Sequence, residues 1–168
     1  NQTGYIQIAQ FSVPTAQEFH NAALQLQAKG MKKLLLDLRG NGGGTMDAAI
    51  QIADEFLPDG YLILSSKGLH SQEKKHFASA IGILEKTKVV VLIDAQSASA
   101  SEILAGALQD NDRAKIVGRR SYGKGLIQQD KQLKDGSNLR ITVARYYTPS
   151  GRSIQRPYKQ GYDSYRAE

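Results

Sequence analysis

Two short apolar segments, each followed by small residues and a helix-like pattern, constrain the fold more than any other feature. Residues 33–38 read KLLLDL and residues 88–93 read KVVVLI. Nearly continuous apolar runs of this kind are typical of parallel strands covered on both faces. A loop of small residues and then a segment with helical apolar spacing follow each run. Strands that alternate with helices in this way predict an α/β domain with a largely parallel sheet flanked by helices.

The other predicted elements lie around these two strands. The first helix should begin at Thr15, where Thr15 and Glu18 have the spacing of a capping box, and end at Gly30. The polar segment 67–75 predicts an exposed loop. Further strands are predicted at 4–11, 61–65, 115–118, 125–129 and 138–147, with further helices at about 45–57 and after the serine-rich residues 97–101. No repeat or linker divides the chain, so we expect residues 1–168 to form a single domain.

Composition excludes several classes of protein. The 168 residues include no cysteine, which rules out a disulfide scaffold, a thiolate metal site and a cysteine nucleophile. The net charge is +6, but the basic residues are scattered and aromatic residues do not interleave with them, so we expect no nucleic-acid binding. No apolar run approaches the roughly 20 residues of a membrane span. We also expect no metal and no cofactor, because no histidine pair has the spacing of a metal site.

The serine-rich segment lies where α/β proteins place catalytic groups, between the end of a strand and the start of a helix. It reads SASAS over residues 97–101. The helix start supplies free backbone N–H groups, and the alanines are small enough to let a substrate carbonyl approach. Serine is also a preferred N-cap, so these residues could act only as caps. The local pattern does not choose among the three serines, of which Ser99 is the middle one.

A glycine loop follows the first apolar run in the same way. Residues 40–44 read GNGGG, and glycine lets backbone N–H groups turn toward a ligand. Such a loop is typical of an oxyanion hole, a phosphate cradle or simply a tight turn. The phosphate-binding pattern requires Gly-Lys-Ser/Thr at the end of the loop, whereas Gly44 is followed by Thr45 and Met46. The oxyanion hole therefore fits better.

Lys124 stands between two glycines in a predicted strand. Glycines inside a strand mark the close approach of another backbone or ligand, which sets this residue apart from the usual solvated lysine. Alternation along the strand should place Lys124 and Gln128 on one face, where Gln128 could hold the ammonium group. A lysine acts as a general base only when neutral, and burial favours the neutral form. We therefore expect Lys124 to be largely buried and, in an active conformation, within hydrogen-bond reach of Ser99.

Taken together, these motifs resemble those of the carboxyl-terminal processing peptidases, also called tail-specific proteases. The resemblance covers nearly the whole chain in order. The segments that carry it are 36–44 (LDLRGNGGG), 97–103 (SASASEI), 106–108 (GAL), 121–125 (SYGKG) with Gln128, and 146–155 (YYTPSGRSIQ). The resemblance implies a crotonase- and ClpP-like core. It also implies a serine endopeptidase that cleaves polypeptides with unstructured C-termini near their ends, in the periplasm or cell envelope.

The resemblance also implies roles for particular residues. Ser99 is the nucleophile, Lys124 the general base and Gln128 the residue that orients the lysine. The backbone N–H groups that form the oxyanion hole would come from Ala100 and from one of two glycines, Gly43 or Gly44. Family members usually carry a PDZ domain and helical segments upstream, which nothing in these residues resembles. Because Asn1 directly precedes a strand pattern, we expect a fragment of a longer protein.

This sequence departs from the family pattern at a few positions, and other functions stay open. Gly42 stands where the family usually has proline, and Asp-Ala-Gln at 94–96 replaces Asn-Glu-Gly. An acyl-CoA enzyme or a non-catalytic module that binds an apolar ligand would share the implied fold. A Ser–His–Asp hydrolase would need one of three histidines that adjoin none of the motifs and that we interpret as surface residues: His20, His70 and His76.

Overall fold

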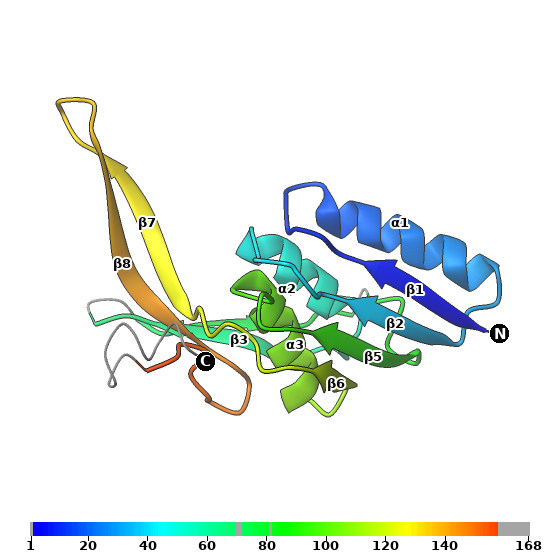
Figure 1. Ribbon diagram of the computed structural model, residues 1–168. Helices are drawn as coiled ribbons and strands as arrows, with labels where there is room; N and C mark the ends of the chain where they lie inside the picture. The colour runs from blue at the N-terminus through cyan, green and yellow to red at the C-terminus, as the bar shows by residue number, and fades with distance from the viewer. Residues whose placement is uncertain (1, 70–71, 81, 158–168) are drawn as a thin grey trace.

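The computed structural model describes residues 2–69, 72–80 and 82–157. Strands and helices alternate along the first third of the chain, three consecutive strands and a further helix and strand follow, and a long hairpin comes last (Figure 1). The elements are β1 (Thr3–Gln7), α1 (Thr15–Ala28), β2 (Lys33–Asp37), α2 (Met46–Asp54), β3 (Leu62–Lys67), β4 (Lys74–Phe77), β5 (Lys88–Ile93), α3 (Ala100–Asp110), β6 (Ala114–Gly118), β7 (Leu126–Gln132) and β8 (Asn138–Tyr147).

A four-stranded parallel sheet forms the frame of the domain, which confirms the predicted α/β class. Its strand order is β1-β2-β5-β6. The two apolar strands recognised in the sequence are neighbours, with Leu34 opposite Val89 and Leu36 opposite Val91. These four side chains are buried, on the face that packs against the helices. Because β2 and β5 are parallel and in register, the loops that follow them emerge side by side.

The opposite face of this sheet is less covered than the sequence predicts. Leu35 and Val90 are only half-buried, and Tyr5 and Val117 on the outer strands are about half exposed, at 52% and 50%. The expectation that both faces are fully covered is therefore wrong for the described residues. A continuous apolar run shows that a strand can be buried on both faces, but not what covers the second face.

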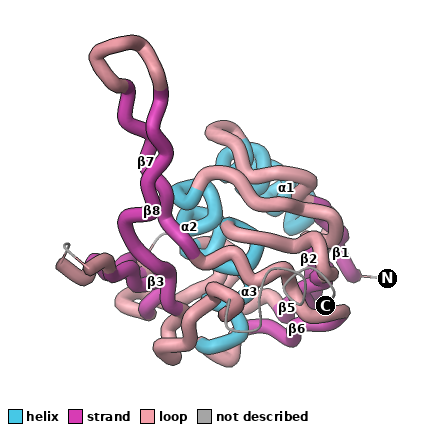
Figure 2. Tube along the Cα trace, turned by 60° about the vertical axis from the view of Figure 1, so that its left-hand side comes forward, coloured by secondary structure: helices cyan, strands magenta, loops and turns pink. Residues whose placement is uncertain are grey.

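A second sheet is antiparallel and was not predicted. Its order is β4-β3-β8-β7, and β3 contacts helices α2 and α3. The β7–β8 hairpin projects far from the body of the domain, and its outer half, residues 128–141, is exposed (Figures 1 and 2). The end of the predicted loop 67–75 forms part of strand β4. This edge strand escapes detection because its lysines lack an apolar alternation, as charged edge strands often do.

The start of helix α1 also differs from the prediction. Thr15 is the first helical residue, not the cap, and its hydroxyl donates to the Gln10 carbonyl at 3.2 Å and accepts the Ser12 N–H at 3.0 Å. The hydroxyl therefore fixes the turn before the helix, so the Thr15–Glu18 capping box is wrong. At the other end, Gly30 has a φ of +83°, as expected for the glycine that follows a helix C-terminus.

Candidate active site

Three loops meet at the carboxyl ends of adjacent parallel strands. The glycine loop follows β2, the serine loop follows β5, and the segment with Lys124 follows β6. The Gly40 N–H donates to the Asp94 carboxylate at 3.0 Å, and the Ala98 N–H donates to the Asn41 carbonyl at 3.0 Å. These bonds join the first two loops directly. The structure thus brings together the three motifs singled out in the sequence.

Ser99 has a backbone conformation that serine rarely adopts. It caps helix α3 with a φ of 55° and a ψ of −111°, and its side chain is half-buried. Positive φ costs energy for any residue with a Cβ atom, and such strain persists only where the surrounding structure imposes it. Its carbonyl accepts the N–H groups of Glu102 and Ile103, at 2.9 and 3.0 Å. These capping bonds hold Ser99 in its strained conformation at the N-terminus of helix α3.

The other two serines of the segment are committed to structure. Ser97 is fully buried, and its hydroxyl donates to the Leu38 carbonyl at 2.8 Å and accepts the Asp94 N–H at 2.9 Å. Ser101 is also fully buried, and its hydroxyl donates to the Asn41 carbonyl at 3.0 Å. Both hydroxyls therefore hold the serine loop against the glycine loop. Ser99 is the one of the three that is not enclosed.

The glycine loop lies directly against Ser99. A Cβ atom at Gly43 would stand 2.6 Å from the Ala98 carbonyl oxygen and 2.8 Å from the Ser99 Cβ, closer than real Cβ contacts allow. The φ of Gly43 is +100°. Both the close approach and the backbone conformation require glycine here. Asn41 is fully buried, and its amide donates to the Ile8 carbonyl at 2.7 Å, so the loop has a fixed support.

Two backbone N–H groups remain open in the residues that adjoin the contact between Gly43 and Ser99. The Gly43 N–H is already engaged, because it donates to Asn41 Oδ1 at 2.8 Å. Gly44 forms a parallel bridge with Phe11, in which the Phe11 N–H donates to the Gly43 carbonyl and the Thr45 N–H donates to the Phe11 carbonyl. The N–H of Gly44 itself therefore points away from Phe11. Within the described part of the chain, neither the Gly44 N–H nor the Ala100 N–H has a hydrogen-bond acceptor. This geometry favours Gly44 over Gly43 as the partner of Ala100 in an anion-binding pair.

Lys124 is exposed, contrary to the expectation of burial. The two flanking glycines do mark a close approach, but of the closing segment of the chain. A Cβ at Gly123 would stand 2.8 Å from Arg156 Cβ, and one at Gly125 would stand 2.4 Å from the Gln155 nitrogen. The glycines thus let residues 154–156 pass over the loop. This packing fixes the backbone of Lys124, whereas its side chain lies in solvent.

Gln128 is exposed as well, and alternation does not carry it onto a common face with Lys124. Strand β7 begins at Leu126, after Lys124, and its register against β8 shifts between Ile127 and Gln128. The extra residue of this irregularity, Val143, lies on β8, so it is the start of β7 after Lys124 that separates the two side chains. Lys124 and Gln128 would share a face only if one unbroken strand ran from residue 124 to residue 128. Within the described residues the Gln128 side chain makes no hydrogen bond.

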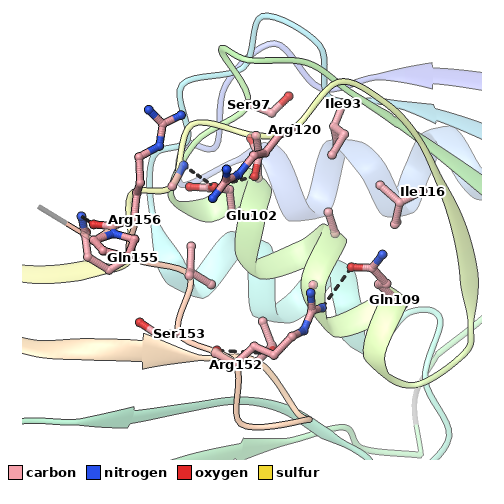
Figure 3. A pocket seen from close by; sticks show the side chains of 18 residues that line it. Ile93, Ser97, Glu102, Gln109, Ile116, Arg120, Arg152, Ser153, Gln155 and Arg156 are labelled. Carbon is pink, nitrogen blue, oxygen red and sulfur yellow. Dashed lines mark hydrogen bonds between the residues drawn. The ribbon is translucent and has the colours of Figure 1, made fainter. Parts of the chain in front are cut away.

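Glu102 is a site residue that the sequence reasoning missed. Its carboxylate is 6% exposed and accepts the backbone N–H groups of Ser99 and Lys124, both at 2.8 Å. It lines a cavity of about 430 Å³ together with Gln155 and Arg156 (Figure 3). The spacing Ser99-Ala-Ser-Glu102 is that of a capping box, the signal that could have identified it.

A further carboxylate, that of Asp37, shapes the start of the glycine loop. Asp37 ends β2 with 1% exposure and receives a bidentate pair of bonds from Arg39, at 2.9 and 2.7 Å. These bonds hold the pKa of Asp37 at about 2, against the opposing effect of burial. Tyr5 donates a further bond to the same carboxylate at 2.9 Å. The charged pair of Asp37 and Arg39 therefore stabilises the turn between β2 and the glycine loop.

Neither described histidine is hydrogen-bonded to Ser99. His20 on α1 contacts Glu55 at 2.6 Å, which joins the first helix to the end of the second. His76 lies on β4 in the wall of an apolar groove of about 700 Å³, together with Met46, Ile127 and Ile141. His70 lies outside the described residues. The groove begins next to the site, because Met46 follows the glycine loop and Ile127 follows Lys124.

The sequence of this chain matches the model of peptidase family S41 over residues 2–161, and the chain belongs to that family. The carboxy-terminal-processing protease of Bartonella bacilliformis is 43% identical over 157 residues, which are 90% of this chain and 36% of that protein. The carboxyl-terminal-processing protease of a Synechocystis strain is 42% identical over 91% of this chain and 35% of its own length. The chain therefore spans about a third of the length of these relatives.

The solved structures include a similar fold at comparable identity. A photosystem II D1 C-terminal processing protease superposes with a TM-score of 0.86 at 38% identity, over 91% of this chain and 39% of that one. This likeness and the family match confirm the resemblance recognised in the sequence. Among the described residues no helix combines the length and apolarity that crossing a membrane requires.

Proposed function

We propose that residues 1–168 form the catalytic domain of a serine endopeptidase of the carboxyl-terminal processing type. Ser99 is the nucleophile and Lys124 the general base. The observation that carries the proposal is the strained Ser99, which lies against Gly43 beside the open N–H groups of Gly44 and Ala100. Membership in a peptidase family supports the same reaction class.

The arrangement supplies the groups that acyl transfer needs. Ser99 Oγ attacks the scissile carbonyl carbon and gives its proton to the neutral Lys124 amine. The N–H groups of Gly44 and Ala100 stabilise the negative charge that develops on the carbonyl oxygen. Lys124 then donates the proton to the leaving amine, and water later releases the acyl group from Ser99 by the reverse sequence.

The base step requires the Lys124 side chain to move from its exposed position. Its backbone is held next to Ser99 by Glu102, so rotation about the side-chain bonds can bring the amine inward. Gln128, also exposed, is the candidate to receive it there. We propose that a bound substrate completes this arrangement by covering the site and excluding water.

The substrate we propose is an unstructured polypeptide near its C-terminus. An extended chain can pair with the outer edge of β7, which begins just after Lys124 and, among the described strands, pairs only with β8. The apolar groove with Met46 and Ile127 would take its apolar side chains. We also propose a periplasmic or cell-envelope location, as the family resemblance implies; a 42% identical relative from Tetradesmus obliquus is named a chloroplastic C-terminal processing peptidase.

Replacement of Ser99 tests the proposal directly. A fluorophosphonate probe should label the wild-type protein and not Ser99→Ala, and cleavage of an unfolded polypeptide should be lost in the same variant. Circular dichroism of both proteins checks that the fold is kept. Undiminished cleavage by a folded Ser99→Ala variant would falsify the assignment.

The remaining candidate functions predict other results. A Ser–His–Asp hydrolase would lose more than about 100-fold of its rate in His20→Gln, His70→Gln or His76→Gln, which is the low end of a general base's contribution. The Ser–Lys mechanism predicts that all three variants stay active. An acyl-CoA enzyme would hydrolyse or transfer a thioester without Ser99, and a binding module would leave the fluorophosphonate unreacted.

A further inference from the structure

Glu102 is a buried carboxylate for which the proposed reaction has no assigned role. Its Oε2 accepts the N–H groups of Ser99 and Lys124, each at 2.8 Å. Its Oε1 accepts the Ser121 hydroxyl and the Gly123 N–H, each at 2.7 Å. An ionised carboxylate offers about four lone-pair sites, so these four donors occupy all of its acceptor capacity. Bonds to a charged acceptor are also the stronger kind.

Helix capping explains only one of these four bonds. Glu102 is the third residue of α3, where a glutamate commonly returns to bond the N–H of the capping residue, here Ser99. The other three donors belong to residues 121–124, which follow β6 and lie outside the helix. One carboxylate therefore joins the loop with the proposed nucleophile to the loop with the proposed base.

We propose that Glu102 is a positioning residue that holds the backbone of Lys124 in a set place relative to that of Ser99. The inference rests on the proposed Ser99–Lys124 mechanism and deepens it. A single oxygen receives both amides, so neither backbone can shift without breaking a bond to that atom. The exposed lysine side chain can then rotate, while the backbone that carries it keeps its position. Displacement of a reacting group by about 1 Å can cost about 100-fold in rate.

The chemistry of the site requires a carboxylate and not an amide. A glutamine side chain has one acceptor oxygen and an NH₂ group that can only donate. In Glu102→Gln the NH₂ would face either the Ser99 and Lys124 amides or the donors of Ser121 and Gly123. At least one backbone N–H would then face an NH₂ group in place of an acceptor, although the side chain keeps its size: those of Ser99 and Lys124 in the first orientation, and that of Gly123 in the second.

The test separates positioning from simple loss of fold. We expect Glu102→Gln to lower kcat by about 100-fold with KM roughly unchanged, because Glu102 touches the catalytic backbone and not the substrate. The rate is expressed per reactive serine, counted by fluorophosphonate labelling. Ser121→Ala is the matched control: it removes one donor from Oε1, leaves both bonds at Oε2 and should keep most of its kcat.

Different failures have different meanings. If the labelled fraction of Glu102→Gln falls while kcat per labelled serine stays at the wild-type value, Glu102 only supports folding and the inference is wrong. If the wild type cleaves in a Ser99-dependent way and Glu102→Gln cleaves equally well, the inference fails alone. If the wild type neither labels nor cleaves, the proposed function has failed.

A measurement on the wild-type protein covers the case in which Glu102→Gln does not fold. Amide hydrogen exchange should be slow at Ser99, Gly123 and Lys124 alike, although the last two lie in a loop. The exposed turn residue Gly136 provides the comparison within the same protein. Exchange at Gly123 and Lys124 as fast as at Gly136 would show that the anchor does not hold, and would overturn the inference.

Discussion

Gly43 packs directly against Ser99, so closely that a Cβ atom added to the glycine would stand 2.8 Å from the Cβ of the serine. The contact brings the glycine loop after β2 into the serine loop after β5. A side chain at Gly43 would push Ser99 and Ala100 away from the loop. The nucleophile and the anion-binding amides therefore depend on the absence of one side chain.

The first prediction uses two adjacent glycines of this loop. Gly43→Ala should lower activity by at least about 100-fold and reduce stability, because alanine is strained at a φ of +100° and would meet three atoms at 3.0 Å or less. Gly42→Ala is the matched control, since a Cβ there would meet no atom within 4 Å. Steady-state cleavage and thermal unfolding of both variants check this, and equal effects at the two positions would contradict it.

The second prediction concerns the proposed base. Lys124→Arg should be nearly inactive, because a guanidinium cannot lose a proton at usable pH. The fold should be unchanged, since the Lys124 side chain is exposed and only its backbone N–H is anchored. Lys29→Arg, an exposed change at the end of helix α1, should keep wild-type cleavage. Full activity of a folded Lys124→Arg would end the Ser–Lys mechanism.

The third prediction separates structural serines from the nucleophile. Ser97→Ala should lower the free energy of unfolding by about 1–3 kcal/mol, because it leaves the Leu38 carbonyl and the Asp94 N–H without their shared hydroxyl partner. Fluorophosphonate labelling should persist in the variant. Ser137→Ala, at the exposed hairpin turn, should stay within about 0.5 kcal/mol of the wild type in denaturant titrations. Loss of labelling in a stable Ser97→Ala protein would point to Ser97.

The fourth prediction is a dependence of stability on pH. The pKa of Asp37 is lowered from its ordinary 3.8 to about 2, so between these values the unfolded chain binds more protons than the folded one. The contribution of Asp37 is therefore present above about pH 5 and is lost as the pH falls toward 2. It amounts to at most about 2 kcal/mol, because Arg39 is more than half exposed and its charge is screened.

Comparison of variants isolates this contribution. Asp37→Asn should be less stable than the wild type at pH 6 and should lose less stability between pH 5 and pH 2. Asp59→Asn, at an exposed turn, should follow the wild-type curve. Parallel curves for Asp37→Asn and wild type would show that this carboxylate is not the group responsible.

The sequence by itself determined the parts of this protein that depend on neighbours along the chain. Apolar runs at 33–38 and 88–93 specified parallel strands, and small residues after them specified the loops that meet at the sheet's edge. Glycine at 42–44 and serine at 97–101 indicated the site, because backbone freedom and capping are local properties. The family resemblance then singled out Ser99, whose strained backbone supports the same choice.

Only the tertiary structure decided which distant groups meet. The apparent capping box at Thr15–Glu18 does not form, whereas the equivalent spacing at Ser99–Glu102 does and also captures Lys124. Segment 154–156 covers the glycines beside Lys124, and β7 begins only at Leu126, so the alternation expected to join Lys124 to Gln128 does not start at the lysine. Local sequence patterns indicate which helix, strand, turn or cap a segment can form. Which partner it meets depends on long-range packing, which brings residues far apart in the chain to one carboxylate and leaves the lysine side chain in solvent.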